Sequence, residues 1–152
     1  MLICRLSALG ISSISFVEQL KSFSVKQVRD VILKYDETLK NYCENLNSLN
    51  VYPVPDGDTG TNMSFTLKSV IEELDGEDEN PEAQWEAIRH GSLMGARGNS
   101  GVILSQILRG LADSFSNKTQ MDNQAIAEAL THASQAAYAS VLKPVEGTIL
   151  TV

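Results

Sequence analysis

The sequence predicts an all-α protein whose helices form an antiparallel bundle. Apolar residues recur every three or four positions in five separate segments, which is the spacing of one helix face. Gly and Pro turn signals separate these segments, and none of them alternates between apolar and polar residues as a half-buried strand does. Because alternate loops of an up-and-down bundle lie at the same end, the loop after the first helix should lie near the loop between the third and the fourth.

The first two predicted helices flank a proline-rich loop. Ser24 and Gln27 have the spacing of a capping box, so we expect the first helix to begin there and to end near Leu49. The second helix should run from about Thr61 to Gly76. The apolar positions expected to face inward are Val28, Ile32, Tyr35, Leu39, Tyr42, Leu46 and Leu49 in the first helix, and Met63, Leu67, Val70, Ile71 and Leu74 in the second.

The third, fourth and fifth predicted helices each have a start signal. Asn80, followed by proline, should cap the third helix, which breaks over residues 95–101. The fourth helix should restart near Ser100, and the fifth should run from Asp122 through Leu142. The apolar positions expected to face inward are Trp85, Ile88 and Leu93, then Ile103, Ile107, Leu108, Leu111 and Phe115, then Ile126, Ala129, Leu130, Ala133, Ala137 and Val141.

The composition favours a single globular domain and argues against a nucleic-acid-binding or membrane-spanning protein. The chain of 152 residues is 43% hydrophobic and 20% charged, which suits one domain with a buried core. Its net charge of −7 argues against binding to the nucleic-acid backbone. Cys4 and Cys43 lack the spacing of metal ligands, which fits a reducing cytosol. No apolar run is long enough to span a membrane, so we expect a cytoplasmic protein.

We divide the chain into a leader, residues 1–23, and a helical domain, residues 24–152. The leader has one early basic residue and a mixed apolar stretch, which faintly resembles a signal peptide. It has no clear cleavage pattern, so a poorly packed leader is favoured over secretion.

The segment NVYPVPDGDTGTN, residues 50–62, is the first candidate site. Asp56 and Asp58 flank Gly57, whose backbone freedom can turn both carboxylates toward one point. Crowded oxygen ligands of this kind suit Mg²⁺, which in turn brings phosphates. The same residues also form ordinary β-turns, so on their own the two interpretations are evenly matched. The spacing excludes an EF-hand, because Leu67 stands where that loop needs glutamate.

The segment GARGNSG, residues 95–101, is the second candidate site. Its glycines allow main-chain N–H groups to approach a ligand, Arg97 adds positive charge, and Ser100 begins a helix whose N-terminus can attract anions. It is not a Walker A loop, because no Gly-Lys-Ser/Thr follows. Alone it would more often be a tight interhelical turn, but its pairing with the acidic loop favours a phosphate site.

Three motifs resemble one family. LNVYPVPDGDTGTNM, GSLMGARGNSGVILSQILRG and KPVEGTIL occur in the order found in the nucleotide-binding domain of bacterial fatty acid kinase, which is similar to the ATP-binding L subunit of dihydroxyacetone kinase. The resemblance covers about residues 46–152. It implies an antiparallel helical bundle or barrel of the dihydroxyacetone kinase L-subunit type, which binds ATP and two Mg²⁺ ions at one end.

The resemblance also implies roles for individual residues. Asp56 and Asp58 match the metal-binding carboxylates, and Asn50 is the nearest equivalent of a third ligand. Arg97 is implied to position the γ-phosphate and is the candidate catalytic residue. The residues implied to bind the nucleotide are Thr59, Gly60, Thr61, Asn62, Gly95, Ala96, Gly98, Asn99, Ser100, Gly101 and Thr148.

The implied function is ATP- and Mg²⁺-dependent phosphoryl transfer, with a fatty acid carboxylate as acceptor and a separate fatty-acid-binding protein presenting it. One alternative is a dihydroxyacetone kinase L-type subunit, which works with a triose-binding subunit. Another is an inactive truncated module, because the sequence ends where the family's domain continues. We then expect Ile149, Leu150 and Val152 to have nothing to pack on. A homodimer is a further option.

Overall fold

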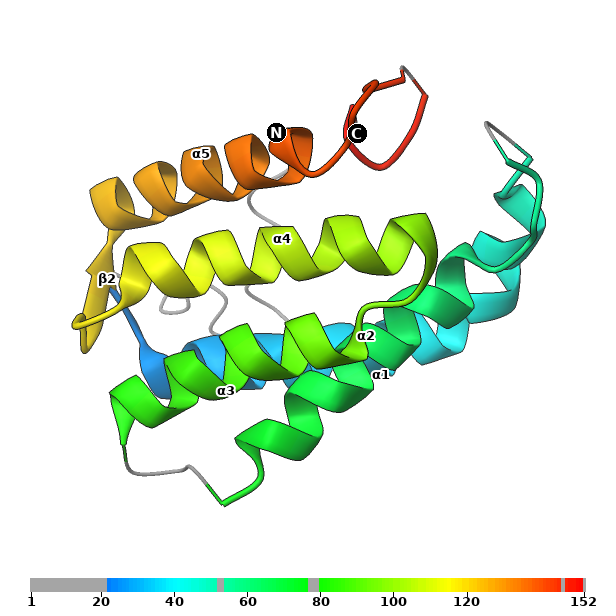
Figure 1. Ribbon diagram of the computed structural model, residues 1–152. Coiled ribbons are helices and arrows are strands. Elements are labelled where there is room, and N and C mark those ends of the chain that lie inside the picture. The colour runs from blue at the N-terminus through cyan, green and yellow to red at the C-terminus, as the bar shows by residue number, and fades with distance from the viewer. Residues whose placement is uncertain (1–21, 52–53, 77–79, 146, 152) are drawn as a thin grey trace, which may run out of the picture.

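The computed structural model describes residues 22–51, 54–76, 80–145 and 147–151. Residues 1–21 of the predicted leader therefore lie outside the described residues. Within the described ranges the chain forms an up-and-down arrangement of antiparallel helices (Figure 1). The helices are α1 (Val25–Leu49), α2 (Thr59–Leu74), α3 (Pro81–Gly95), α4 (Gly98–Phe115) and α5 (Asn123–Ala139), and the strands are β1 (Ser22–Ser24) and β2 (Gln120–Asp122).

The all-α prediction is confirmed, with small shifts at helix ends. Both α2 and α4 begin two residues earlier than the sequence suggested. The amide of Asn62 already donates to the carbonyl of Asp58 at 2.8 Å, and that of Gly101 to Arg97 at 3.1 Å. Helix α5 ends at Ala139 rather than Leu142, where the Ser140 amide closes the last turn. None of the described helices is long and apolar enough to cross a membrane.

A short antiparallel ladder joins β1 to β2 and was not predicted. Phe23 pairs with Met121, and the Ser22 hydroxyl donates to Gln120 Oε1 at 2.8 Å. Each strand has only three residues, too few to show a repeating alternation. The ladder connects the residues that precede α1 to those that precede α5, and the side chain of Met121 is fully buried.

The core is a single cluster in which all five helices take part. The rings of Trp85 and Phe115 lie 5.4 Å apart within it. Its other fully or nearly fully buried apolar residues include Leu67, Val70, Leu74, Ile88, Leu104, Ala112 and Ala129.

Several residues predicted to face the core are exposed instead. The buried face of α3 consists largely of small residues, including Gly91, Ser92 and Gly95, so Leu93 lies outside it and is 51% exposed. The buried stripe of α5 is a strict four-residue repeat of alanines, which leaves Leu130 58% exposed. Tyr42 and Leu49, predicted to face inward from α1, are exposed as well.

The C-terminal segment contacts the core, contrary to expectation. Ile149 is partly buried and packs against the core cluster, so the prediction that it would lack a packing partner is wrong. Leu150 is half-buried. Val152 lies outside the described residues.

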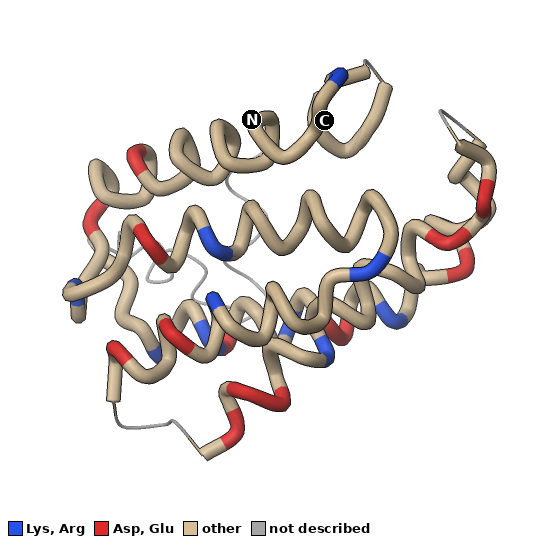
Figure 2. Tube along the Cα trace, in the orientation of Figure 1, with Lys and Arg blue, Asp and Glu red and all other residues tan. Residues whose placement is uncertain are grey.

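Charged residues are distributed over all the helices. Figure 2 shows Lys and Arg interspersed with Asp and Glu along the trace, without a basic stripe on the part of the chain that is described.

Candidate functional site

The two candidate motifs lie at the same end of the bundle. The end of α1, the start of α2, the junction between α3 and α4, and the segment after α5 all gather there (Figure 1). The Ser100 hydroxyl of α4 donates to the carbonyl of Thr59 in α2 at 3.4 Å. The prediction that the two loops share one end is therefore confirmed, and their helices touch at their first turns.

Gly98 and Asn62 are in very close contact at this junction. The φ of Gly98 is +56°, in the left-handed region that favours glycine, and a Cβ on Gly98 would collide with Asn62 Nδ2. Asn62 is only 7% exposed, and its Nδ2 has no hydrogen-bond acceptor among the described residues. A buried donor without an acceptor is costly, and such a group calls for a functional or structural reason.

The helices that meet at this junction differ from the others in their N-caps. The side chains of Ser24, Asn80 and Asp122 accept hydrogen bonds from first-turn amides of α1, α3 and α5, as the sequence predicted. The N-cap residues of α2 and α4 are Asp58 and Arg97, and neither makes a side-chain cap. The first turns of α2 and α4 therefore keep N–H groups that can bind an anion.

Asn47 fixes the start of α2 and was missed by sequence reasoning. Its Nδ2 donates to Thr61 Oγ1 at 2.9 Å, and its Oδ1 accepts from the Thr61 amide at 3.2 Å. Gly60 permits this close approach of α1 and α2, because a Cβ there would collide with the carbonyl oxygen of Cys43. The one available signal was that Cys43 and Asn47 are polar or weakly polar residues one turn apart, near the loop.

Thr66 links three helices from a fully buried position. Its hydroxyl donates to the Asn62 carbonyl at 3.1 Å and lies 3.5 Å from the carbonyl oxygens of Gly95 and Gly101. A Cβ on Gly95 would lie 2.6 Å from Ser69 Cβ, and one on Gly101 would lie 2.9 Å from Thr66 Oγ1. These two glycines, predicted to cradle phosphate, thus allow α3 and α4 to pack closely on α2. No local sequence signal identified Thr66.

The acidic loop holds its two carboxylates in different surroundings. Asp56 is exposed and accepts a hydrogen bond of 2.5 Å from Asn50 Nδ2. Asp58 is half-buried, and its carboxylate has no hydrogen bond or ion pair with the described residues. The described residues contain no group of three or more His, Cys, Asp or Glu that could hold a metal. A cation here would take its remaining ligands from Asn50, water or a bound phosphate.

Arg97 lies at the junction and Thr148 lies in the segment after α5, and the side chain of each is held by its own segment. The Arg97 guanidinium donates to the carbonyls of Met94 and Ala96 at 3.0 and 2.7 Å, where it caps the end of α3. Thr148 donates to the Val145 carbonyl at 2.8 Å. Among the other predicted ligands, Asn99 is exposed in the first turn of α4.

Comparison with known proteins agrees with this architecture. Residues 53–152 match the DAK2 domain over about two thirds of the chain. The chain belongs to the DAK2 domain family. The DAK2 domain is of the dihydroxyacetone kinase L-subunit type.

Related proteins occur in Staphylococcus aureus. Proteins of strains USA300, NCTC 8325 and bovine RF122, each described as uncharacterized, are 45% identical to this chain over 128 residues. The alignment covers 84% of this chain and 23% of each relative. The chain thus spans about a quarter of the length of these relatives.

Proposed function

We propose that this DAK2 domain binds ATP with Mg²⁺ and serves as the nucleotide-binding part of a phosphotransferase. The observation that carries the proposal is the contact between Ser100 and Thr59, which joins two helix N-termini whose N-cap residues, Asp58 and Arg97, make no side-chain cap. Two such N-termini offer several N–H groups and two favourable helix dipoles to one polyphosphate.

The residues at the junction fit a phosphate. Asn62 Nδ2 is a buried donor in need of an acceptor, and it lies against Gly98, where any larger residue would collide with it. Phosphate oxygens are strong acceptors, so binding would offset the cost of unpaired donors in this region.

The acidic loop fits a magnesium ion that arrives with the nucleotide. Mg²⁺ commonly uses one or two carboxylates together with phosphate oxygens and water, rather than an all-protein cage. Asp56 and Asp58 supply two carboxylates, and Asn50 Oδ1 supplies a third oxygen while its amide nitrogen bonds Asp56. The bound nucleotide and metal would supply the transferable phosphoryl group and neutralise its charge.

Residues of this chain would bind the nucleotide and orient its phosphates. The first-turn amides of Gly98, Asn99 and Ser100, with those of Thr59 and Gly60, would hold phosphate oxygens. Arg97 is exposed and could leave the carbonyls of α3 for the γ-phosphate, where a positive charge stabilises the transferring group. The hydrogen bonds between Asn47 and Thr61 would keep the first turn of α2 in place.

For the acceptor, we propose a fatty acid carboxylate presented by a separate binding protein. The resemblance of the NVYPVP segment to fatty acid kinase supports this choice. Membership of the DAK2 family equally supports an L-type subunit that acts on dihydroxyacetone with a triose-binding partner. An assay with each candidate partner distinguishes the two acceptors: a fatty acid acceptor gives acyl phosphate, and dihydroxyacetone gives triose phosphate.

Calorimetric titration with ATP, with and without Mg²⁺, tests nucleotide binding. We expect saturable binding that requires Mg²⁺ and weakens at least about tenfold in Asp56→Asn and Asp58→Asn. Asp75→Asn, an exposed aspartate at the far end of α2, is the matched control and should bind normally. Absence of binding, or equal affinity in all three variants, would overturn the proposal.

A further inference from the structure

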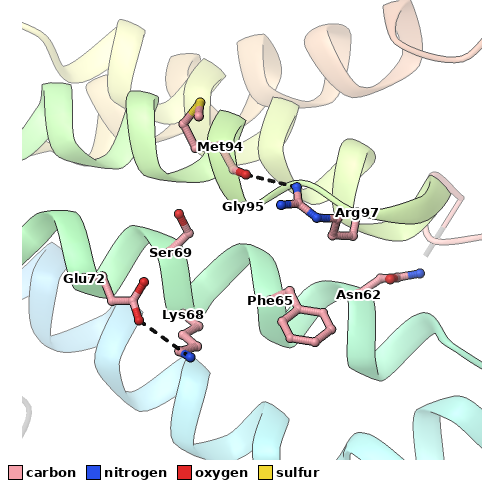
Figure 3. A pocket seen from close by; sticks show the side chains of 8 residues that line it. All are labelled: Asn62, Phe65, Lys68, Ser69, Glu72, Met94, Gly95 and Arg97. Atoms are coloured by element: carbon pink, nitrogen blue, oxygen red, sulfur yellow. Dashed lines mark hydrogen bonds and ion pairs between the residues drawn. The ribbon is translucent and has the colours of Figure 1, made fainter.

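A row of apolar side chains on α5 lies apart from the candidate nucleotide site. The pocket of that site lies between α2 and the end of α3 and is lined in part by Asn62, Gly95 and Arg97 (Figure 3). None of the described residues that line it comes from α5. Figure 1 shows α5 at one edge of the bundle, where it packs on α4. Helix α5 therefore presents a surface that the proposed nucleotide site does not use.

Two neighbouring rows of residues run along α5, and only one of them is fully buried. The rows repeat every four residues and are Ala125, Ala129, Ala133 and Ala137, and, one position later, Ile126, Leu130, Ser134 and Tyr138. The alanine row is buried, with Ala133 close against Gly110 of α4. In the second row Leu130 is 58% exposed and Tyr138 is 40% exposed. Rows of this spacing are the ridges through which helices pack, so the second row suits another helix.

The ladder between β1 and β2 places the start of the chain beside α5. Ser22 pairs with Asp122, the N-cap residue of α5, in an antiparallel register. In such a pair the chain that precedes Ser22 and the chain that follows Asp122 leave the ladder in the same direction. Residues 1–21 therefore join the described structure beside the first turn of α5, at an end from which they can run the length of the helix.

The sequence of residues 1–21 has the spacing of an amphipathic helix. Five large apolar residues, in a series with Ser13, recur at intervals of three or four, and they are Leu2, Leu6, Leu9, Phe16 and Leu20. The opposite side of such a helix holds Cys4, Ile11, Ser15, Glu18 and Gln19. A helix over residues 1–21 would be about 31 Å long, against about 25 Å for the 17 residues of α5. Gly10 and four serines lower the helix propensity of this segment, so the helix would form against a packing surface rather than alone.

We propose that residues 1–21 form a helix that lies antiparallel to α5 and covers its row of Ile126, Leu130, Ser134 and Tyr138. The point of attachment favours this segment over a second copy of the chain, because a tethered segment has an effective concentration in about the millimolar range. Leu20 would lie near the first turn of α5, and Cys4, about 24 Å further along, would lie near Tyr138 at its end. This packed helix would take the place of the poorly packed leader that the sequence favoured.

Amide NMR of the full chain with a spin label on Cys4 tests this proposal. Cys43→Ser leaves Cys4 as the one cysteine, and Cys4 lies on the side of the proposed helix that faces away from α5. We expect the label to broaden amides near Tyr138 more strongly than those near Ala125, although the segment is attached at the start of α5. Strongest broadening near Ala125 or in another helix would overturn the proposal. Equal broadening between spin-labelled and isotope-labelled chains mixed in one sample would also overturn it, because it would indicate a second copy.

Leu130→Asp and Leu93→Asp are a matched pair of variants for this test. The two side chains are 58% and 51% exposed, so neither change places a charge in the core. Leu130→Asp should reduce the broadening near Tyr138 by at least about threefold, because docking would then bury an unpaired carboxylate. Leu6→Asp in the segment itself should have the same effect, whereas Leu93→Asp on α3 should leave the broadening unchanged. Equal broadening in all three variants would show that residues 1–21 do not cover this row.

Discussion

The hydroxyl of Ser100 donates a hydrogen bond of 3.4 Å to the backbone carbonyl of Thr59, across 41 residues of sequence. This contact joins the first turn of α4 to the first turn of α2. It combines two short motifs, each ambiguous alone, into one surface where two helices begin without a side-chain cap from their N-cap residues, beside two aspartates. Substitutions at and around this junction can show how it is built and what it binds.

Gly98→Ala should destabilise the fold more than Gly76→Ala. Both glycines have positive φ, which costs an L-residue about 1–2 kcal/mol. A Cβ on Gly76 would meet no atom within 4 Å, whereas a Cβ on Gly98 would collide with the buried side chain of Asn62. Urea denaturation of both variants measures the difference. Equal losses of stability would show that the contact between Gly98 and Asn62 is not tight in solution.

Asn47 and Thr61 should be energetically coupled. Each single change, Asn47→Ala or Thr61→Val, breaks one or both hydrogen bonds and should cost about 1–2 kcal/mol of unfolding free energy. The double variant should lose less than the sum, with a coupling energy of about 0.5 kcal/mol or more. Simple additivity in the double-mutant cycle would mean that the two side chains do not interact in solution.

Thr66→Val should be costly because it removes a buried hydroxyl that bonds across helices. We expect a loss of about 1–2 kcal/mol in unfolding free energy. Thr131→Val is the matched control, since Thr131 makes the same bond to the carbonyl four residues earlier but is exposed. It should change stability by less than about 0.5 kcal/mol. If both variants behave alike, Thr66 has no linking role.

Glu82 should contribute to the acid sensitivity of the fold. Hydrogen bonds from Arg89 and from the Asn117 amide hold the pKa of its carboxyl below the ordinary value of 4.5. A lowered folded pKa means that the contribution is present above the unfolded pKa and is lost as pH falls through the folded one. Stability should therefore fall as the pH drops from the ordinary pKa of a glutamate through the lower pKa of Glu82 in the folded state, and it should fall less steeply in Glu82→Gln.

Glu86→Gln is the control for this pH series. Among the described residues Glu86 accepts a hydrogen bond from Arg89 alone, whereas Glu82 also binds Ser116 and Asn117 and so connects α3 to the end of α4. Chemical denaturation at several pH values measures both variants. If stability falls as steeply with acid in Glu82→Gln as in the unchanged chain, Glu82 does not contribute to the acid sensitivity of the fold.

Features set by neighbouring residues could be predicted from the sequence. The caps at Ser24, Asn80 and Asp122 each depend on residues two or three positions away, and all three form as hydrogen bonds. Five helices and their order followed from the same local periodicity. Leu93 and Leu130 were misassigned because small residues, Gly and Ala, form the contact faces of α3 and α5.

Features that depend on distant contacts could not be predicted. Thr66 meets carbonyls of residues 29 and 35 positions away, and Asn47 meets Thr61 across 14 positions. The ladder between β1 and β2 joins residues about a hundred positions apart and has no periodic signal. For the site, the motifs identified the candidate residues. The packing roles of Gly60, Gly95 and Gly101 became apparent only from helix contacts.

Amide NMR of the chain with saturating Mg·ATP tests most directly whether the two helix N-termini form a polyphosphate site. We expect the largest shifts on the amides of Gly98, Asn99 and Ser100 in α4 and of Thr59 and Gly60 in α2. AMP, which lacks the β- and γ-phosphates, should shift them far less. Shifts confined to other parts of the bundle, or equal shifts with AMP, would contradict a polyphosphate site at this junction.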